Sequence, residues 1–519
     1  MKVLQVLAAL ALLSPAYCYH ILCVFPVPSR SHNLLGWGVV NALLKAGHQV
    51  TWTTPYPETV KNPPKGLRVI DVSATRQYVG DVDLTKKKTS SGIAFVKAFS
   101  NNVTKEVLAN QEVRDVIVNT QFDAVFTEAF FSDVQAGIAA VQQAPWLLLS
   151  GMPLMPSLEA QLDEARSVAT VPMMFNDCGI PMGFYNRLMN TFLYTAMNVG
   201  SWLDRTPTNN LYKSLFAPLA KARGVPLPPF SEALYNVSVL FVNAHESLAP
   251  PLSTPPNVVN VAGYHIDEDL PPLPKDLQEL LDSSPQGVVY FSMGSVLRSA
   301  ALPAHTRTAL LALFGSLDQT VLWKFEAEIE GLPPNVHVRP WMPQPSILAH
   351  PNVRVFITHG GLLSTLEAVK AGVPLLAVPV FGDQPANAER AARAGFARRV
   401  HFSEDMADEL GENLREMLTN DSYYKKVKEL SKLFRARPVP PAKLIPHYVE
   451  LAIETKGAYH LRSLSHQYSW YQRWMLDQLA FVLIILVVLV ELIVITVRIC
   501  ARKLSGTSKN VVTQKQKSN

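Results

Sequence analysis

The sequence predicts an α/β protein in which two domains, each built on a parallel sheet, precede one membrane-spanning helix. Two long stretches alternate short β-rich runs with helical runs, which is the pattern of strands joined by helical crossovers. A proline-rich segment separates these stretches, and a run of nineteen residues with a single charge follows the second. We therefore expect two sheets, each covered by helices on both faces, and a separate membrane anchor.

The first eighteen residues, MKVLQVLAALALLSPAYC, have the composition of a cleaved secretory signal. Lys2 supplies a positive start, an apolar run follows, and small residues stand at Ala16 and Cys18. We assign 1–18 to a signal peptide and expect the mature chain to begin at Tyr19.

The first α/β domain is expected at 19–250. It opens with the strand-like run YHILCVFPVPS, the helical run NLLGWGVVNALLKAGH and the strand-like run QVTWTTP. Further β-rich runs follow, up to VSVLFVNA. The composition then changes to the proline-rich APPLSTPPNVVNVAGYHIDEDLPPLP, which we interpret as an interdomain linker at 251–275.

The second α/β domain is expected at 276–440. Its clearest unit is FITHGGLLSTLEAVKAGVPLLAVPVFGDQ, which predicts a strand, a helix closed by Gly372 and a second strand. Ligands of such units bind where the strands end, and His359 and Asp383 fall at those ends. Gly360 and Gly361 suit a phosphate at the helix start, although a tight turn without a ligand would need the same glycines.

The carboxyl-terminal part contains the predicted anchor. We expect helices returning to the membrane at 441–478, a transmembrane helix at 479–497 and a basic tail at 498–519. The tail carries six basic residues and no acidic one, so the positive-inside rule places it in the cytosol. Both domains would then lie in the lumen.

Composition limits the classes of partner. The net charge is +5, and the basic tail accounts for this excess, so we expect no nucleic-acid partner. Cys23 and Cys178 are the cysteines left for the lumenal part, too few for a disulfide framework. Three sequons fit glycosylation in the lumen, at Asn102, Asn236 and Asn420.

One stretch of the second domain resembles the nucleotide-sugar signature of the UDP-glycosyltransferases. It reads WMPQPSILAHPNVRVFITHGGLLSTLEAVKAGVPLLAVPVFGDQPANAERAARAG. Together with the signal and the single span, it is similar to the membrane-bound animal members of the UDP-glucosyl and UDP-glucuronosyl type, in particular those of invertebrates. The resemblance covers nearly the whole chain. It implies a GT-B fold, in which two Rossmann-like domains face a cleft, the first binding the acceptor and the second the UDP-sugar.

The resemblance also implies which residues bind the donor. Trp341 would stack on uracil and Gln344 would bind its edge. Glu367 would accept hydrogen bonds from both ribose hydroxyls, on a helix face that it shares with Ser364.

A second group would bind the diphosphate and the sugar. Ser295, His359 and the backbone amides from Gly361 onward would hold the diphosphate, and Asp383 with Gln384 would hold hydroxyls of the sugar. No metal or other cofactor is expected, because the helix start would stabilise the leaving diphosphate. Two acid pairs resemble the metal-binding pair of a different glycosyltransferase fold, but neither follows a buried strand, and we interpret them as solvated loop acids: Asp81 with Asp83, and Asp267 with Asp269.

The catalytic base is expected in the first domain. His32 stands at the start of a helix whose dipole would favour the neutral imidazole, and the resemblance implies that it deprotonates an acceptor hydroxyl. Two residues remain candidates for the acid that orients His32. Glu128 occupies the family's position after a strand, whereas Asp133 has the family's usual side chain but could be a helix N-cap. The implied reaction is a direct displacement that inverts configuration.

The substrates are less closely specified by the sequence. Val171–Leu203 contains five of the thirteen methionines with many aromatics, which suits small lipophilic acceptors and a membrane surface, although a core helix would have the same composition. We prefer UDP-glucose to UDP-glucuronate, because no cation is evident for a uronate carboxylate. Detoxification or hormone conjugation is one expectation, and a lipid-specific glycosyltransferase of membrane assembly is the alternative. A non-catalytic binding protein is disfavoured by His32 and the complete signature.

The last five residues, KQKSN, have the spacing of a dilysine retrieval signal at Lys515 and Lys517. We therefore expect a single-pass type I protein of the endoplasmic reticulum membrane with its catalytic domains in the lumen. A homo-oligomer is compatible with this arrangement.

Overall fold

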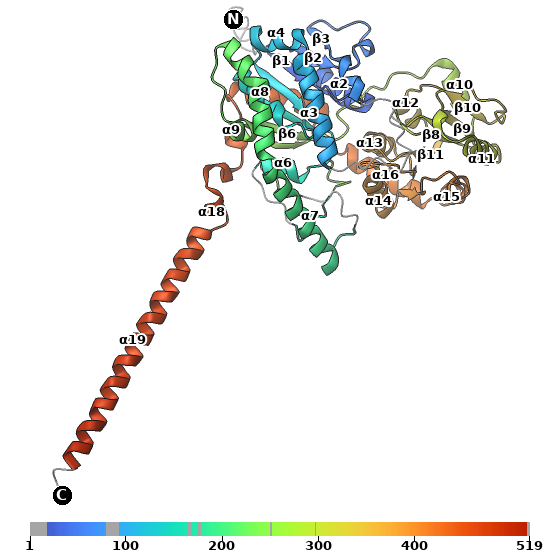
Figure 1. The fold of residues 1–519 in the computed structure, drawn as a ribbon. Coiled ribbons are helices and arrows are strands. Elements are labelled where there is room, and N and C mark those ends of the chain that lie inside the picture. The colour runs from blue at the N-terminus through green and yellow to red at the C-terminus, as the bar shows by residue number, and fades with distance from the viewer. Residues whose placement is uncertain are drawn as a thin grey trace, which may run out of the picture. The chain divides into compact units, whose positions relative to one another are not determined.

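The computed structural model describes residues 18–78, 93–162, 168–173, 178–249, 252–295 and 297–515. The chain divides into two compact units, Met1–Arg462 and Ser463–Asn519. The first unit contains two separate sheets flanked by helices (Figure 1). The predicted signal peptide, apart from Cys18, and the acid pair of Asp81 and Asp83 lie outside the described residues.

The first sheet has seven strands in the order β3-β2-β1-β4-β5-β6-β7, and all neighbouring pairs are parallel. The strands are β1 (His20–Val24), β2 (Gln49–Thr54), β3 (Leu67–Asp71), β4 (Ala124–Glu128), β5 (Trp146–Ser150), β6 (Val237–Val242) and β7 (Val258–Asn260). Every residue of β4, β5 and β6 is buried, as a parallel sheet covered on both faces requires.

Helices cover both faces of this sheet. They are α2 (Arg30–Lys45), α3 (Ile93–Ala109), α4 (Gln111–Asn119), α5 (Ala136–Gln142), α6 (Pro156–Gln161), α7 (Phe184–Leu203), α8 (Arg205–Arg223), α9 (Phe230–Tyr235) and α17 (Pro441–Glu454). One core lies under α3, α4, α5, α8 and α9, and the other lies under α2 and α17. Helix α17 comes from the far end of the chain, yet Ile445 and Val449 pack in the same core as Leu35 and Leu43 of α2.

The segment predicted as a linker contains the last strand of the first sheet. Within 251–275, β7 (Val258–Asn260) pairs with β6. A strand of three residues among prolines is too short to show an alternating or continuous apolar pattern, so it could not be predicted from the sequence.

The second sheet has six strands in the order β10-β9-β8-β11-β12-β13, again with every neighbouring pair parallel. The strands are β8 (Val288–Ser292), β9 (Thr320–Lys324), β10 (Val336–Arg339), β11 (Val353–Thr358), β12 (Leu375–Ala377) and β13 (Ala397–Arg399). The helices are α10 (Lys275–Asp282), α11 (Ala304–Gly315), α12 (Gln344–Leu348), α13 (Leu362–Ala371), α14 (Gln384–Arg393), α15 (Ala407–Thr419) and α16 (Ser422–Arg435). The predicted strand, helix and strand are β11, α13 and β12, and Gly372 ends α13 with a φ of +76° that favours glycine.

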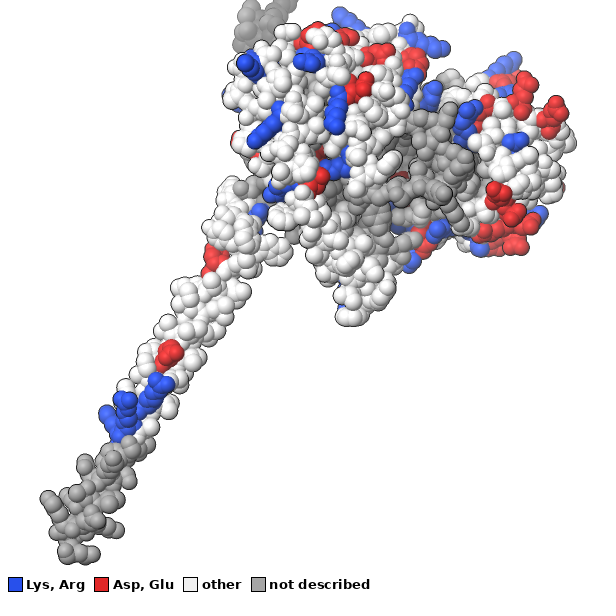
Figure 2. All heavy atoms as spheres, viewed as in Figure 1, with Lys and Arg blue, Asp and Glu red and all other residues white. Residues whose placement is uncertain are grey.

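The second unit contains η6 (Leu464–Gln467), α18 (Trp470–Arg473) and α19 (Leu476–Lys515). The 28 residues Leu476–Lys503 are long and apolar enough to cross a membrane, and they include the predicted span 479–497. Figure 2 shows few charges along this helix before a group of basic side chains, which are Arg498, Arg502 and Lys503. The side chains of Lys515 and Lys517 are outside the described part of the chain.

Gly137 of α5 is a position where one added methyl group should disturb the core. A Cβ atom there would lie 2.2 Å from Cδ2 of Phe216, which is fully buried. Gly137→Ala should therefore destabilise the protein by about 1–3 kcal/mol and lower its apparent melting temperature.

The matched control is Gly200→Ala in α7, since a Cβ at Gly200 meets no atom within 4 Å. This change should be neutral or stabilise the helix by about 0.5–1 kcal/mol. Equal melting temperatures for the two variants in a thermal unfolding experiment would contradict the packing of α5 on α8.

Candidate active site

The side chains of His32 and Glu128 meet at one edge of the first sheet. Glu128 ends β4, and His32 lies in the first turn of α2, the helix that follows β1. Since β1 and β4 are parallel neighbours, the segments after them leave the sheet at the same edge. Nδ1 of His32 contacts Oε1 of Glu128, whose side chain is 1% exposed. This contact orients the imidazole and leaves Nε2 as the ring nitrogen for a substrate.

The pKa of His32 is raised from its ordinary value. Burial lowers the pKa, but the charge of Glu128 and its hydrogen bond raise it by more, and the charge of Asp383 adds to the rise. The helix dipole would favour the neutral ring, but Glu128 acts in the opposite direction, and a carboxylate in direct contact outweighs the partial charge of a helix end. His32 is accordingly a stronger base than an ordinary histidine.

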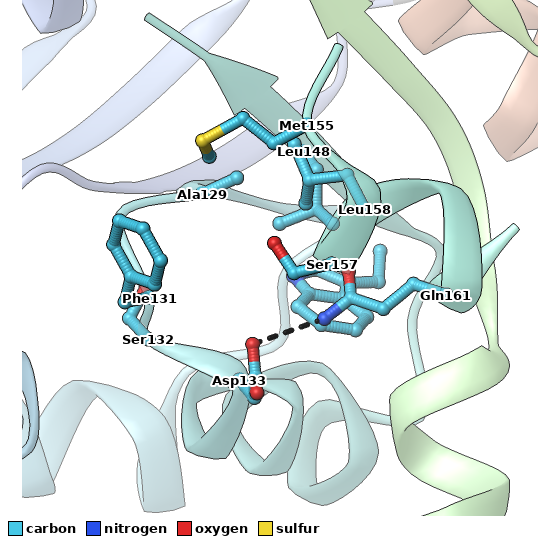
Figure 3. A pocket seen from close by; sticks show the side chains of 10 residues that line it. Ala129, Phe131, Ser132, Asp133, Leu148, Met155, Ser157, Leu158 and Gln161 are labelled. Carbon is cyan, nitrogen blue, oxygen red and sulfur yellow. Dashed lines mark hydrogen bonds between the residues drawn. The ribbon is translucent and has the colours of Figure 1, made fainter. Parts of the chain in front are cut away.

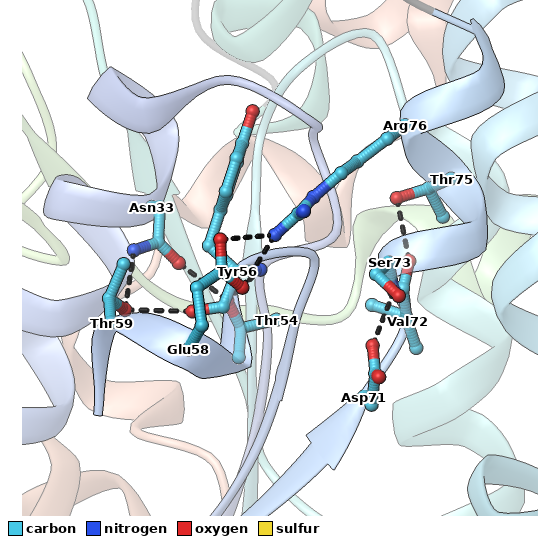
Figure 4. A network of polar contacts seen from close by, with 10 residues as sticks. All are labelled: Asn33, Thr54, Tyr56, Glu58, Thr59, Asp71, Val72, Ser73, Thr75 and Arg76. Atoms are coloured by element: carbon cyan, nitrogen blue, oxygen red, sulfur yellow. Dashed lines mark hydrogen bonds and ion pairs between the residues drawn. The ribbon is translucent and has the colours of Figure 1, made fainter. Parts of the chain in front are cut away.

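The start of α2 is braced by polar contacts, which Figure 4 shows. Nδ2 of Asn33, the residue after His32, donates to Oγ1 of Thr59 at 3.3 Å. In the same network Arg76 pairs with Glu58 at 2.7 Å. These contacts tie the loop after β2 to the helix that carries His32.

Asp133 has other partners. Its Oδ2 lies 3.3 Å from Nζ of Lys97, and its Oδ1 accepts a hydrogen bond of 3.2 Å from Gln161 (Figure 3). Asp133 also lines a recess whose other walls are largely apolar: Ala129, Phe131, Ser132, Trp146, Leu148, Met155, Ser157, Leu158 and Gln161. The structure thus brings Glu128, and not Asp133, into contact with His32.

In the second domain, three of the predicted donor-binding residues contact one another. Nε2 of Gln344 donates to Oε2 of Glu367 at 2.6 Å and to Oγ of Ser364 at 3.1 Å. Burial raises the pKa of Glu367 to about 7, and the hydrogen bond from Gln344 limits the rise. Trp341, on the loop before α12, is 66% exposed and offers a free indole face.

His359 directly follows β11, and its ring lies between Gly294 and Gly361. A Cβ at Gly294 would be 2.6 Å from Cε1 of His359, and a Cβ at Gly361 would be 2.5 Å from its Nε2, so a larger residue at either position would displace the ring. Burial, assisted by the charge of Lys324, lowers the pKa of His359 to about 4. The ring is therefore neutral. Ser295 follows Gly294 and is exposed.

Lys324 is a charged residue of this site that was not predicted. It ends β9 and is 8% exposed. Its Nζ donates to the carbonyl oxygen of Gly294 at 2.8 Å and pairs with Glu326 at 2.9 Å. The rule that ligands bind at the carboxyl ends of parallel strands could have identified it, because it is the polar residue that closes the run TVLWK.

Asp383 is the last residue of the loop after β12, and Gln384 is the first residue of α14. Oε1 of Gln384 accepts hydrogen bonds from two backbone amides of this loop, at 2.9 and 3.1 Å, so the buried side chain fixes the loop. Oδ2 of Asp383 accepts a bond of 2.7 Å from Asn387. Burial raises the pKa of Asp383. The hydrogen bond from Asn387 and the charges of Arg390 and His32 lower it, but by less. The charges of Asp383 and His32 act on each other's pKa. This interaction links the predicted donor-binding residues to the predicted catalytic residues.

The acid pair of Asp267 and Asp269 is exposed in its loop, and Asp267 pairs with Lys45 at 3.2 Å. Across the described residues, no group of three or more His, Cys, Asp or Glu side chains is arranged to hold a metal ion.

The described helix of the methionine-rich segment Val171–Leu203, which is α7 (Phe184–Leu203), is not a core helix. Among the described side chains of α7, Asn190 alone is buried, and its Nδ2 donates to the carbonyl oxygens of Val168 and Val171 at 2.8 and 2.9 Å. Large apolar side chains of α7 are between 57% and 74% exposed: Phe184, Tyr185, Leu188, Phe192, Trp202 and Leu203. The alternative of a core helix is therefore wrong.

Comparisons with known proteins identify the family of the chain. The family model described as UDP-glucoronosyl and UDP-glucosyl transferase matches residues 29–511. UDP-glucosyltransferase 2 of Dactylopius coccus is 32% identical over 91% of this chain and 91% of its own, and UDP-glucuronosyltransferase 1A1 of Mus musculus is 26% identical over 91% and 89%. A solved structure of the glycotransferase of kitacinnamycin, 18% identical, covers 84% of this chain and 99% of its own with a TM-score of 0.56, and such neighbours have the GT-B fold. The chain therefore belongs to the family of UDP-glucuronosyl and UDP-glucosyl transferases, animal-type enzymes that transfer a sugar from a UDP-sugar.

Proposed function

We propose that the chain is an inverting glycosyltransferase that moves glucose from UDP-glucose to a hydroxyl group of small lipophilic acceptors. The contact of His32 with the buried Glu128, in electrostatic reach of Asp383, is the observation that carries this proposal. Nε2 of His32 takes the proton of the acceptor hydroxyl. The acceptor oxygen then bonds to the anomeric carbon while the bond to UDP breaks, and UDP leaves with the bonding electrons. Attack opposite UDP inverts the configuration and gives a β-glycoside from an α-linked donor.

Glu128 orients His32 in this mechanism. Its carboxylate holds Nδ1 and stabilises the imidazolium that forms when Nε2 accepts the proton. Asp133 has no part in this step, because Lys97 and Gln161 engage it.

The nucleoside is held by the loop and helix around Gln344. Trp341 stacks on uracil through its exposed face, and Gln344 reaches the edge of the base. Glu367, next to Ser364, accepts hydrogen bonds from the ribose hydroxyls, which stabilise its charged form.

The diphosphate and the sugar are held at the ends of β8, β11 and β12. Ser295, the neutral ring of His359 and the amides from Gly361 at the start of α13 bind the diphosphate. Because these donors stabilise the leaving group, the reaction needs no metal or other cofactor. Asp383 and Gln384 bind sugar hydroxyls.

Glucose is the sugar that we favour. The relative from Dactylopius coccus at 32% identity is named a UDP-glucosyltransferase. In addition, the buried Lys324, whose charge acts on His359, is already paired with Glu326, which makes it a poor partner for a uronate. Use of UDP-glucuronate is the alternative, supported by the similarity to the mouse glucuronosyltransferase.

The acceptor is proposed to enter over the first domain. Phe130 packs edge-on against His32 with ring centroids 4.7 Å apart, and its neighbour Phe131 lines the apolar recess. The exposed apolar face of α7 would collect lipophilic molecules, as detoxification or hormone conjugation requires. A lipid acceptor of membrane assembly is the second candidate, because the same face would meet a bilayer.

We further propose that the enzyme resides in the endoplasmic reticulum membrane as a single-pass type I glycoprotein. The apolar helix Leu476–Lys503, the basic residues that follow and the terminal KQKSN support this location.

Exchange of the base tests the mechanism most directly. His32→Ala should reduce kcat by about 10²–10⁴-fold and leave the Kd of UDP within about twofold, because the residue acts on the acceptor. Glu128→Gln should lower kcat strongly, whereas the matched exchange Asp133→Asn should have little effect. Unchanged turnover in Glu128→Gln, or turnover kept within a few-fold in His32→Ala, would refute the assignment.

Because the proposed reaction needs no metal, adding EDTA should not change turnover.

Donor recognition can be divided by comparing UDP with UDP-glucose in calorimetric titrations. Trp341→Ala should weaken both ligands by about 1–3 kcal/mol, because a base loses its stacking partner. Asp383→Ala should weaken UDP-glucose and spare UDP. If Asp383→Ala weakens UDP as much as Trp341→Ala does, Asp383 does not hold the sugar.

Location is tested by the state of the glycans. Wild-type protein should carry glycans sensitive to endoglycosidase H, and Lys515→Ser with Lys517→Ser should let resistant glycans accumulate. Lys509→Ser, which removes a basic residue outside the dilysine spacing, is the control. Resistant glycans on the wild-type protein at steady state would argue against retention.

A further inference from the structure

His265 is a buried histidine beside the proposed ribose site. It follows β7 in the loop that leads to the second domain, and its side chain is 1% exposed. Neither Nδ1 nor Nε2 has a hydrogen-bond partner within the described part of the chain. Because folded proteins rarely leave buried polar atoms unpaired, both nitrogens call for an explanation.

The neighbour of this ring is Glu367. Nε2 of His265 lies 3.8 Å from Oε1 of Glu367, which is too far for a direct hydrogen bond. The other carboxylate oxygen of Glu367 is occupied by Gln344 at 2.6 Å. A hydroxyl group between Nε2 and Oε1 can hydrogen-bond both atoms, as an acceptor to the ring and a donor to the carboxylate.

The protonation state of His265 suits the binding of a hydroxyl group. Burial, with a contribution from the charge of Lys370, lowers the pKa of His265 to about 3. The ring is therefore neutral at physiological pH and carries one N–H donor and one acceptor nitrogen. No strong ion pair with Glu367 competes with the hydroxyl.

The loop around His265 is fixed from two sides. The hydroxyl group of Tyr264 donates to the carbonyl oxygen of Leu35 in α2 at 2.9 Å. Nζ of Lys370, one turn after Glu367 in α13, donates to the carbonyl oxygen of Ile266 at 3.1 Å. The loop thus joins the helix that carries His32 to the helix that carries Glu367.

We propose that His265 is a positioning residue for the donor, and that its imidazole and Glu367 together hold a hydroxyl group of the UDP ribose. This inference rests on the proposed function, since it takes Glu367 as the ribose ligand. His265 takes no proton in the reaction. It sets the position of the nucleoside and, through the loop that Tyr264 anchors, the distance between the donor and helix α2.

The test compares UDP with 2′,3′-dideoxy-UDP, which lacks both ribose hydroxyls, in titrations of the full-length detergent-solubilised protein. Wild type should bind UDP more tightly than the dideoxy analogue. His265→Leu should weaken UDP by about tenfold and the analogue by less than about twofold, because it removes a bond to a hydroxyl group. His265→Gln, which keeps an N–H donor, should recover part of the preference.

A merely structural role would weaken both ligands equally, and that result would overturn the inference, as would an unchanged preference for UDP in both variants. His48→Leu is the matched control, because His48 is also 1% exposed but pairs with Glu450 in the first domain. It should leave the preference unchanged. Thermal unfolding of each variant shows whether it is folded, and His265→Gln supplies the measurement if His265→Leu is not.

Failure of the proposed function gives a different result. If wild-type protein does not bind UDP, or if Glu367→Gln keeps the full preference for UDP over the analogue, the donor site itself is wrong. If Glu367→Gln loses that preference and both His265 variants keep it, the donor site stands and the role of His265 falls.

Discussion

The parallel pairing of β1 with β4 is the constraint on which the catalytic arrangement depends. Their register, with Val24 beside Thr127, brings the segments after the two strands to the same height. A slip of one residue would turn Glu128 to the opposite face of the sheet and away from His32. The second oxygen of Glu128 is buried without a hydrogen-bond partner in the described structure, which costs free energy.

Neighbouring charges shift the pKa values of two histidines of this site in opposite directions. His32 and His359 are both partly buried, yet the carboxylate of Glu128 raises the pKa of the first and the ammonium group of Lys324 helps to lower that of the second. In the proposed mechanism the first imidazole is the base, and the second is a neutral hydrogen-bonding group. The nearest charge decides which role each histidine has.

Sequence patterns were sufficient for the two parallel sheets and for the strand, helix and strand from β11 to β12, because continuous apolar runs between glycines have few other solutions. They were not sufficient to choose between Glu128 and Asp133, which are separated only by contacts across the fold with His32 and Lys97. Composition also could not place α7, since methionine and aromatic residues suit a core and an exposed apolar face equally.

His265 and Lys324 were missed for a related reason. Each is a single polar residue next to an apolar run, and its significance depends on a neighbour more than twenty-five residues away in the chain, Glu367 for one and Gly294 for the other. Such pairs have no local signal. They become apparent only in the fold, where the end of β9 lies beside Gly294 and the loop after β7 lies beside Glu367.

Helix α17 has a consequence for the order in which the protein can fold. Its residues Ile445 and Val449 complete the core that α2 and the first sheet begin. During synthesis this core stays incomplete until the ribosome has made the whole second domain, although domains usually fold as they emerge. Until then, the apolar residues of α2 that pack against Ile445 and Val449 lack these partners.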